Sequence, residues 1–194
     1  MHRHYNISGA LALAILLIAS GPALADISGV IQMCQGCHGE DGRGVDPNTP
    51  IIAGMPAIVQ EDALYAYIDG DRVCGTMPIM CNIASKLTED QVVELAEHFA
   101  SLPYVPAGEE FDAALAEAGK TIHDANCAIC HGAGDPSDAQ SSVLHGQRKN
   151  YLRYALQQYV AGERTQLPAM ETKVSALSDD DIEALLNYYA SYEN

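Results

Sequence analysis

The pentapeptide Cys-x-x-Cys-His occurs twice in this chain of 194 residues. Two cysteines one helical turn apart present both thiols on one face of a helix, and the next residue brings an imidazole beside them. This pattern is the attachment site of c-type haem, in which the thiols form thioethers to the porphyrin and the histidine binds the iron. One copy alone is also compatible with half of a zinc site, but two copies with equivalent downstream residues favour haem. The predicted attachment residues are Cys34, Cys37 and His38 in the first copy and Cys127, Cys130 and His131 in the second.

Both copies belong to a longer unit that repeats with a period of about 92 residues. Each motif is followed by a helical pattern that ends at a glycine, Gly70 or Gly162, which is a common residue at helix ends. A methionine then stands seven residues before the Leu-Thr or Leu-Ser pair at the start of a final helix. The predicted capping boxes of this helix are Thr88 with Gln91 and Ser178 with Asp181.

No segment alternates polar and apolar residues as a half-buried strand does, so the sequence predicts an all-α fold. Residues 102–108 contain two prolines and a glycine, which interrupt the helical periodicity. We therefore expect two tandem domains, residues 26–101 and 109–194, with a linker at 102–108. Residues 109–124 are expected to form the first helix of the second domain, with Phe111 on its apolar side. Each domain is small for an independent core, so a covalently held haem is expected to add apolar bulk.

Residues 1–25 have the pattern of a cleavable secretory signal. A weakly basic start is followed by an apolar run over residues 11–19 and by the small-x-small sequence Ala23-Leu24-Ala25. We expect cleavage before Asp26 and export to the periplasm. An uncleaved membrane anchor is the alternative, for which the apolar run is short.

The chain carries 26 acidic residues against 10 basic ones, a formal net charge of −16. This charge excludes nucleic-acid binding and disfavours contact with an anionic membrane surface. It is compatible with docking to a basic patch on a partner protein, and equally with a solvated acidic surface.

A haem iron that only carries electrons needs a sixth ligand, and a methionine thioether is a common choice because it stabilises the reduced iron. Counted back from the final helix, Met80 and Met170 occupy equivalent positions in the two repeats. We therefore predict the axial pairs His38 with Met80 and His131 with Met170. Met77 has no equivalent in the second repeat and is the alternative ligand of the first haem.

Cys74 and Cys81 flank the loop that contains Met80, and the second repeat has no equivalent of either cysteine. An oxidising compartment permits disulfides and disfavours free thiols. We predict a Cys74–Cys81 disulfide that closes the ligand loop, with free thiols as the alternative.

The histidines outside the haem motifs and the signal are His98, His123 and His145. We expect them to be hydrogen-bonded surface or core residues, with His145 as a rival ligand because its loop faces the second haem. Arg72 and Arg164 close equivalent helices. They are candidates either for pairing with haem propionates or for solvated cations at helix ends.

Two Cys-x-x-Cys-His units, each with a methionine before a Leu-Ser/Thr-acidic helix start, resemble the dihaem class I cytochromes c of the c4 class. The linker sequence Tyr104-Val105-Pro106-Ala107 and the segment after it resemble more closely the dihaem subunit of flavocytochrome c sulfide dehydrogenase. The resemblance implies two cytochrome c folds related by a pseudo-twofold axis, with haem propionates meeting at their interface and with the same two axial pairs. The Cys74–Cys81 pair departs from the family pattern.

The sequence thus predicts a periplasmic dihaem protein that transfers single electrons and is not itself an enzyme. Its expected partners are a dehydrogenase for sulfur compounds, of the flavocytochrome c type, and a terminal oxidase or another cytochrome. The alternative is a dihaem enzyme, either a peroxidase or a thiosulfate-oxidising cytochrome, which needs an exchangeable sixth ligand at one iron.

Overall fold

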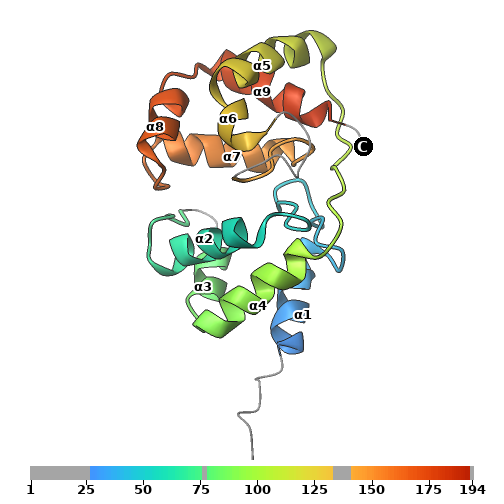
Figure 1. Ribbon diagram of the computed structural model, residues 1–194, viewed down its shortest axis with the longest axis vertical. Coiled ribbons are helices and arrows are strands. Elements are labelled where there is room, and N and C mark those ends of the chain that lie inside the picture. The colour runs from blue at the N-terminus through green and yellow to red at the C-terminus, as the bar shows by residue number, and fades with distance from the viewer. Residues whose placement is uncertain (1–26, 76–77, 133–140, 193–194) are drawn as a thin grey trace, which may run out of the picture.

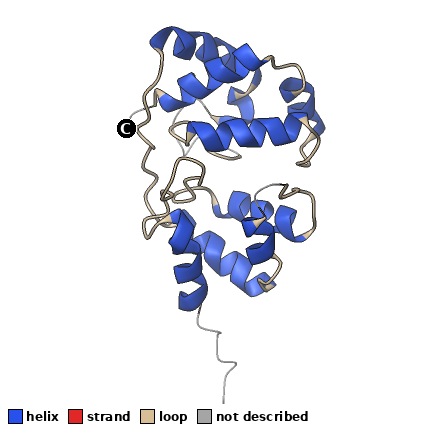
Figure 2. Cartoon of the chain, turned by 180° about the vertical axis from the view of Figure 1, so that it is seen from behind, coloured by secondary structure: helices blue, strands red, loops and turns tan. Residues whose placement is uncertain are grey.

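The computed structural model describes residues 27–75, 78–132 and 141–192, and within these ranges every regular element is a helix (Figures 1 and 2). This confirms the predicted all-α fold. The predicted signal, residues 1–25, lies outside the described residues, as does Met77. Within the described part of the chain, no helix is long and apolar enough to cross a membrane.

The helices form two groups that lie one above the other, with an extended segment running along one side between them (Figure 1). In the first group, α2 packs against α3 and α4; in the second, α9 packs along α5 and against α7, which also contacts α8. The first group consists of α1 (Ser28–His38), α2 (Ala57–Ile68), α3 (Ile79–Ala84) and α4 (Glu89–Ala100). The second consists of α5 (Ala113–Asn126), α6 (Ala128–His131), α7 (Lys149–Val160), α8 (Pro168–Val174) and α9 (Asp179–Ala190).

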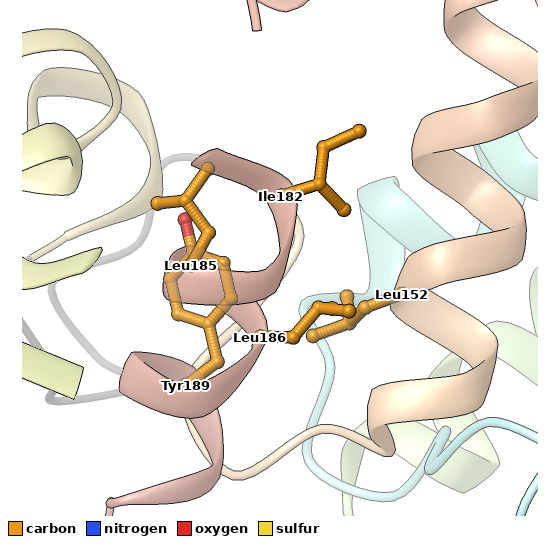
Figure 3. Packing of buried hydrophobic residues seen from close by; sticks show 5 residues of the cluster. All are labelled: Leu152, Ile182, Leu185, Leu186 and Tyr189. Carbon is orange, nitrogen blue, oxygen red and sulfur yellow. The ribbon is translucent and has the colours of Figure 1, made fainter. Parts of the chain in front are cut away.

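The last helix of each group carries at least half of the buried apolar residues that the structure describes in that group. A capping box opens each of these helices as predicted, formed by Thr88 with Gln91 and by Ser178 with Asp181. In α4 the buried side chains are Val92, Leu95, Ala96 and Phe99. In α9 they include Ile182, Leu185, Leu186 and Tyr189, which form a cluster with Leu152 of α7 (Figure 3).

The first helix of the second group, α5, begins later than the sequence predicted. It starts at Ala113 because the Asp112 carboxylate accepts hydrogen bonds from two N–H groups of the first turn, at 2.8 and 3.0 Å. Phe111 therefore precedes the helix and is 42% exposed, so its predicted place on the apolar side is wrong. The residues of α5 that are buried are Ala116, Gly119 and His123.

Equivalent glycines connect the loop after each haem motif to the last helix of the same group. The Gly54 N–H donates to the Phe99 carbonyl at 2.9 Å, and the Gly146 N–H donates to the Tyr189 carbonyl at 2.7 Å. Both glycines have a positive φ, 67° and 77°, which favours glycine over other residues. The two loops therefore keep the same backbone geometry in both repeats.

The extended segment between the groups lies against both of these loops. Tyr104 packs on Gly54 and Pro106 packs on Gly146, so closely that a Cβ on either glycine would overlap them. The Tyr104 hydroxyl also donates to the His145 carbonyl at 2.6 Å. The segment thus fixes the two loops relative to each other.

Candidate haem-binding sites

The two Cys-x-x-Cys-His motifs lie at helix ends, but in different ways. The first occupies the last turns of α1, which ends at His38. The second begins at Cys127, at the break between α5 and α6. None of the four motif cysteines belongs to a disulfide, and in each pair one is half-buried and the other exposed. Neighbouring thiols of this kind suit a two-point attachment to the edge of a flat macrocycle.

Both motif histidines direct Nδ1 at a backbone carbonyl. The distance is 3.2 Å from His38 Nδ1 to the Pro50 oxygen and 2.9 Å from His131 Nδ1 to the Ser142 oxygen. A carbonyl only accepts, so Nδ1 carries the proton and Nε2 keeps its lone pair. Burial lowers the pKa of both imidazoles, which favours the neutral form that binds metals. Both histidines therefore fit the role of an iron ligand.

Met80 and Met170 occupy equivalent places in two short helices. Met80 stands in α3 four residues before the buried Ala84, and Met170 stands in α8 four residues before the buried Val174. Residues with this spacing share one face of a helix, and both methionines are half-buried. Because Met77 lies outside the described residues, the choice of Met80 over Met77 stays a prediction.

Cys74 and Cys81 form a disulfide, with Cα atoms 6.1 Å apart. Cys81 directly follows Met80 in α3, whereas Cys74 belongs to the segment after Arg72 that reaches the second group. The disulfide therefore ties the helix that carries the predicted ligand to the interface.

Arg72 lies at that interface and is only 4% exposed. Its guanidinium carbon is 4.5 Å from the centroid of the Tyr67 ring, and its backbone pairs with that of Arg164 in an antiparallel bridge. Among the described residues, neither arginine forms an ion pair, and the Arg72 Nε has no hydrogen-bond partner. A buried cation is costly without an anion, so a solvated helix end is the wrong interpretation for Arg72 and a carboxylate such as a haem propionate fits.

Tyr151, on α7, is a member of this cluster that the sequence did not indicate. Burial alone would raise the pKa of its phenol, but Arg72 and Arg164 outweigh this and lower the pKa to about 8. Tyr151 is the repeat equivalent of Val59. A tyrosine at an apolar position of the repeat was therefore the sequence signal that could have identified it.

Two of the other histidines belong to the core of the second group. His123 is fully buried, with Nδ1 3.0 Å from the Tyr189 hydroxyl and Nε2 2.7 Å from the Gly132 carbonyl, which confirms its predicted hydrogen-bonded role. His145 is 2% exposed and its ring meets the His123 ring edge-on at 4.8 Å. Burial and the neighbouring His123 and His131 lower the pKa of His145 to about 4, so it is neutral.

Two neighbouring polar residues of the second group, which belong to no sequence motif, bind loops of the first. The Arg148 guanidinium donates to the Arg43 and Gly44 carbonyls, each at 3.0 Å. The Gln147 side chain binds both backbone groups of Ile51. Gln147 replaces Met55 of the first repeat, so a polar residue at an apolar repeat position was the signal.

Known proteins match both the sequence and this geometry. Residues 114–188 match the family model described as cytochrome c oxidase, cbb3-type, subunit III. Cytochrome c-554(548) of Halomonas halodenitrificans is 34% identical over 71 residues, which are 37% of this chain and 86% of that protein. Cytochrome c4 of Pseudomonas aeruginosa is 28% identical over 192 residues, with 92% of each chain covered. The crystal structure of reduced recombinant cytochrome c4 from Pseudomonas stutzeri aligns with a TM-score of 0.72 at 25% identity, covering 86% of this chain and 97% of that one.

The chain belongs to the c4 class of dihaem cytochromes c. A c4-class cytochrome carries two covalently bound c-type haems and transfers electrons, and the cysteines, histidines, methionines and buried Arg72 fit these groups. Bound haem supplies one-electron chemistry at iron, and the protein holds, orients and buries it. One segment of this c4-class chain is also 33% identical over 79 residues to the thiosulfate dehydrogenase electron acceptor of Stutzerimonas stutzeri, covering 41% of this chain and 37% of that protein.

Proposed function

We propose that this c4-class cytochrome is an electron carrier in which each domain binds one six-coordinate haem iron. His38 and Met80 are the axial ligands of the first iron, and His131 and Met170 are those of the second. Each iron is held by the two cysteines of its motif through the porphyrin, within domains 26–101 and 109–194 separated by the linker at 102–108.

The observation that carries this proposal is that the same ligand geometry occurs twice. Each histidine has Nδ1 against a carbonyl and Nε2 available, and each methionine stands one turn before a buried residue of a short helix. Two irons with both axial positions filled by protein have no position for a substrate, which favours electron transfer over catalysis.

The optical spectrum of the oxidised protein tests this proposal. We expect the far-red absorption band of methionine-bound iron at the intensity of two haems, and no rapid binding of carbon monoxide by the reduced protein. If one haem lacks the band and binds carbon monoxide readily, that iron has an exchangeable ligand. The proposal then fails, and the alternative of a dihaem peroxidase or thiosulfate-oxidising enzyme is favoured.

We also propose that the electrons come from a sulfur-compound dehydrogenase and go to a terminal oxidase or another cytochrome. The similarity to a protein named a thiosulfate dehydrogenase electron acceptor, and the resemblance to a flavocytochrome c subunit, support the donor. The match to a cbb3-type oxidase subunit supports the acceptor. Reduction by purified thiosulfate dehydrogenase and by the flavoprotein of a flavocytochrome c distinguishes the two donors, and failure of both overturns the proposed donor class.

The location that we propose is the periplasm, after cleavage of residues 1–25. The signal pattern in these residues and the two haem attachment motifs support it. Mass spectrometry of the protein isolated from the periplasmic fraction should give an N-terminus at Asp26 and the added mass of two haems.

A further inference from the structure

Gln147 forms a two-point contact from the second group to the first. Its Oε1 accepts from the Ile51 N–H at 2.8 Å, and its Nε2 donates to the Ile51 carbonyl at 2.8 Å. Gln147 is 2% exposed and Ile51 is 1% exposed, so both hydrogen bonds are shielded from water. The side-chain amide thus binds Ile51 as the backbone of a neighbouring strand would.

The peptide group that precedes Ile51 also holds the first motif histidine. Its carbonyl, that of Pro50, accepts from His38 Nδ1 at 3.2 Å, while its N–H, that of Ile51, donates to Gln147 at 2.8 Å. Hydrogen bonds that share a peptide group polarise each other, so donation to Gln147 makes the Pro50 carbonyl a stronger acceptor. His38 is therefore bound to Gln147 through one peptide.

Gln147 itself belongs to the loop that holds the second motif histidine. The Gln147 N–H donates to the Leu144 carbonyl at 3.1 Å, and the Ser142 carbonyl in the same loop accepts from His131 Nδ1 at 2.9 Å. The residue that binds the anchor of the first histidine therefore lies in the same loop as the anchor of the second, without contacting that second anchor.

We propose that Gln147 is a positioning residue that sets the reduction potential of the first haem from the other domain. A stronger pull on the His38 Nδ1 proton makes the imidazole a more basic ligand, which stabilises oxidised iron and lowers the potential. The inference rests on the proposed assignment of His38 as an iron ligand. A change in the packing of the two domains would therefore alter the reduction potential of the first haem through the hydrogen bonds of Gln147 and His38.

The test compares three variants of the intact haem-loaded protein. Gln147→Leu removes both hydrogen bonds to Ile51, whereas Gln147→Glu keeps an acceptor for the Ile51 N–H. Gln158→Leu is the matched control, because Gln158 is also 2% exposed and also reaches across the interface, donating to the Val73 carbonyl at 2.7 Å, but does not touch a histidine anchor. The readouts are the potential of each haem, from a spectroelectrochemical titration, and the exchange rate of the His38 Nδ1 proton, from NMR of the reduced protein.

In Gln147→Leu we expect the equilibrium constant for reduction of the first haem to rise about threefold. This is an upward shift of its reduction potential of about 28 mV for one electron. The His38 ring proton should exchange faster, and the second haem should keep its potential. Gln147→Glu should not raise the potential of the first haem, and Gln158→Leu should leave the exchange rate of the His38 Nδ1 proton unchanged.

Equal shifts of both haems in Gln147→Leu, equally faster exchange of the His38 Nδ1 proton in Gln158→Leu, or no shift at all would overturn the inference. The proposed ligand is tested separately in the unmodified protein, where the resonance of the His38 ring proton must respond to oxidation of the iron. If it does not respond, the assignment of His38 fails. If it responds but Gln147→Leu leaves the potentials unchanged, only the role of Gln147 fails.

Discussion

The two motif histidines have different partners. His38 is anchored on a peptide that Gln147 binds from the second group, at 2.8 Å. His131 is anchored on Ser142, and the hydroxyl of Ser141 lies 3.0 Å from the same ring nitrogen, so both of its partners come from its own loop. The first site therefore depends on the interface between the domains, whereas the second is complete within its own domain. The two copies of the repeat thus have equivalent predicted ligands, but only the histidine of the first copy depends on a hydrogen bond from the other domain.

The predicted methionine ligands of the two sites also differ in how far they depend on the interface between the domains. The helix that carries Met80 is tied by the Cys74–Cys81 disulfide to a segment that pairs with the second group. The second repeat has no cysteine at either of the equivalent positions beside Met170. The first site is thus restrained from outside its own helices at both of its predicted ligands, His38 and Met80.

Loss of a ligand methionine should have the largest effect and should stay within one domain. We expect Met80→Ala to make the first haem high-spin, to lower its potential and to let it bind carbon monoxide, because its sixth position opens. Met170→Ala should do the same to the second haem only. Optical and carbon monoxide titrations of both variants check this. The control is Met77→Ala, and a loss of the first haem's far-red band in that variant would show that Met77 is the ligand.

Removal of the disulfide should destabilise the first domain and leave the second unchanged. A closed loop of this length contributes about 2–3 kcal/mol by the chain-entropy account, so the Cys74→Ala/Cys81→Ala double variant should lose about that much free energy of unfolding. Urea unfolding followed at each haem measures it. If the second domain unfolds at the same lowered urea concentration, the restraint is not local to the first domain.

Acid should destabilise the second domain before the first. His145 has a pKa of about 4 in the folded protein and about 6.5 when unfolded, so the unfolded chain binds more protons between these values. Stability from neutral His145 is full above pH 6.5 and is lost as the pH falls towards 4. The equivalent residue of the first repeat is Ala53, which cannot titrate.

The His145→Gln variant, compared with the unmodified protein in urea unfolding at pH 7 and pH 4.5, tests this difference. The variant should lose less stability on acidification, with His123 accounting for part of what remains because burial also lowers its pKa. An equal loss of unfolding free energy in both proteins would show that His145 does not cause the acid sensitivity of the second domain.

Removal of the Ser141 hydroxyl should have the smallest effect. Ser141→Ala deletes one of the two partners of His131 Nδ1, so the second haem should favour reduction by about twofold or less, roughly 18 mV. The first haem should not change. A redox titration that resolves the two haems measures this shift, and a shift of the first haem instead would contradict the local anchoring of His131.

The sequence predicted the parts of the molecule that are repeated in it. The all-α fold, the capping boxes at Thr88 and Ser178 and the Cys74–Cys81 disulfide all depend on local spacing or on cysteine chemistry, and the structure contains each of them. The start of α5 lies four residues later than predicted, because the Asp112 side chain caps the helix there.

What the sequence could not predict is the contact between the repeats. Gln147 and Tyr151 were visible only as departures from the repeat, and nothing local indicates that one reaches Ile51 and the other lies between two arginines. The burial of Arg72 likewise depends on the second group, which covers it with Tyr151. Contacts between domains follow from the docking of two folded units, and no periodicity within one unit encodes them.

Hydrogen exchange of the two histidine Nδ1 protons, measured by NMR in the reduced Gln147→Leu and Ser141→Ala variants, tests the central comparison most directly. We predict a crossed result: Gln147→Leu accelerates exchange at His38 alone, and Ser141→Ala accelerates it at His131 alone. Acceleration of both protons in either variant, or of neither in both, would contradict an interface-dependent first site and an independent second one.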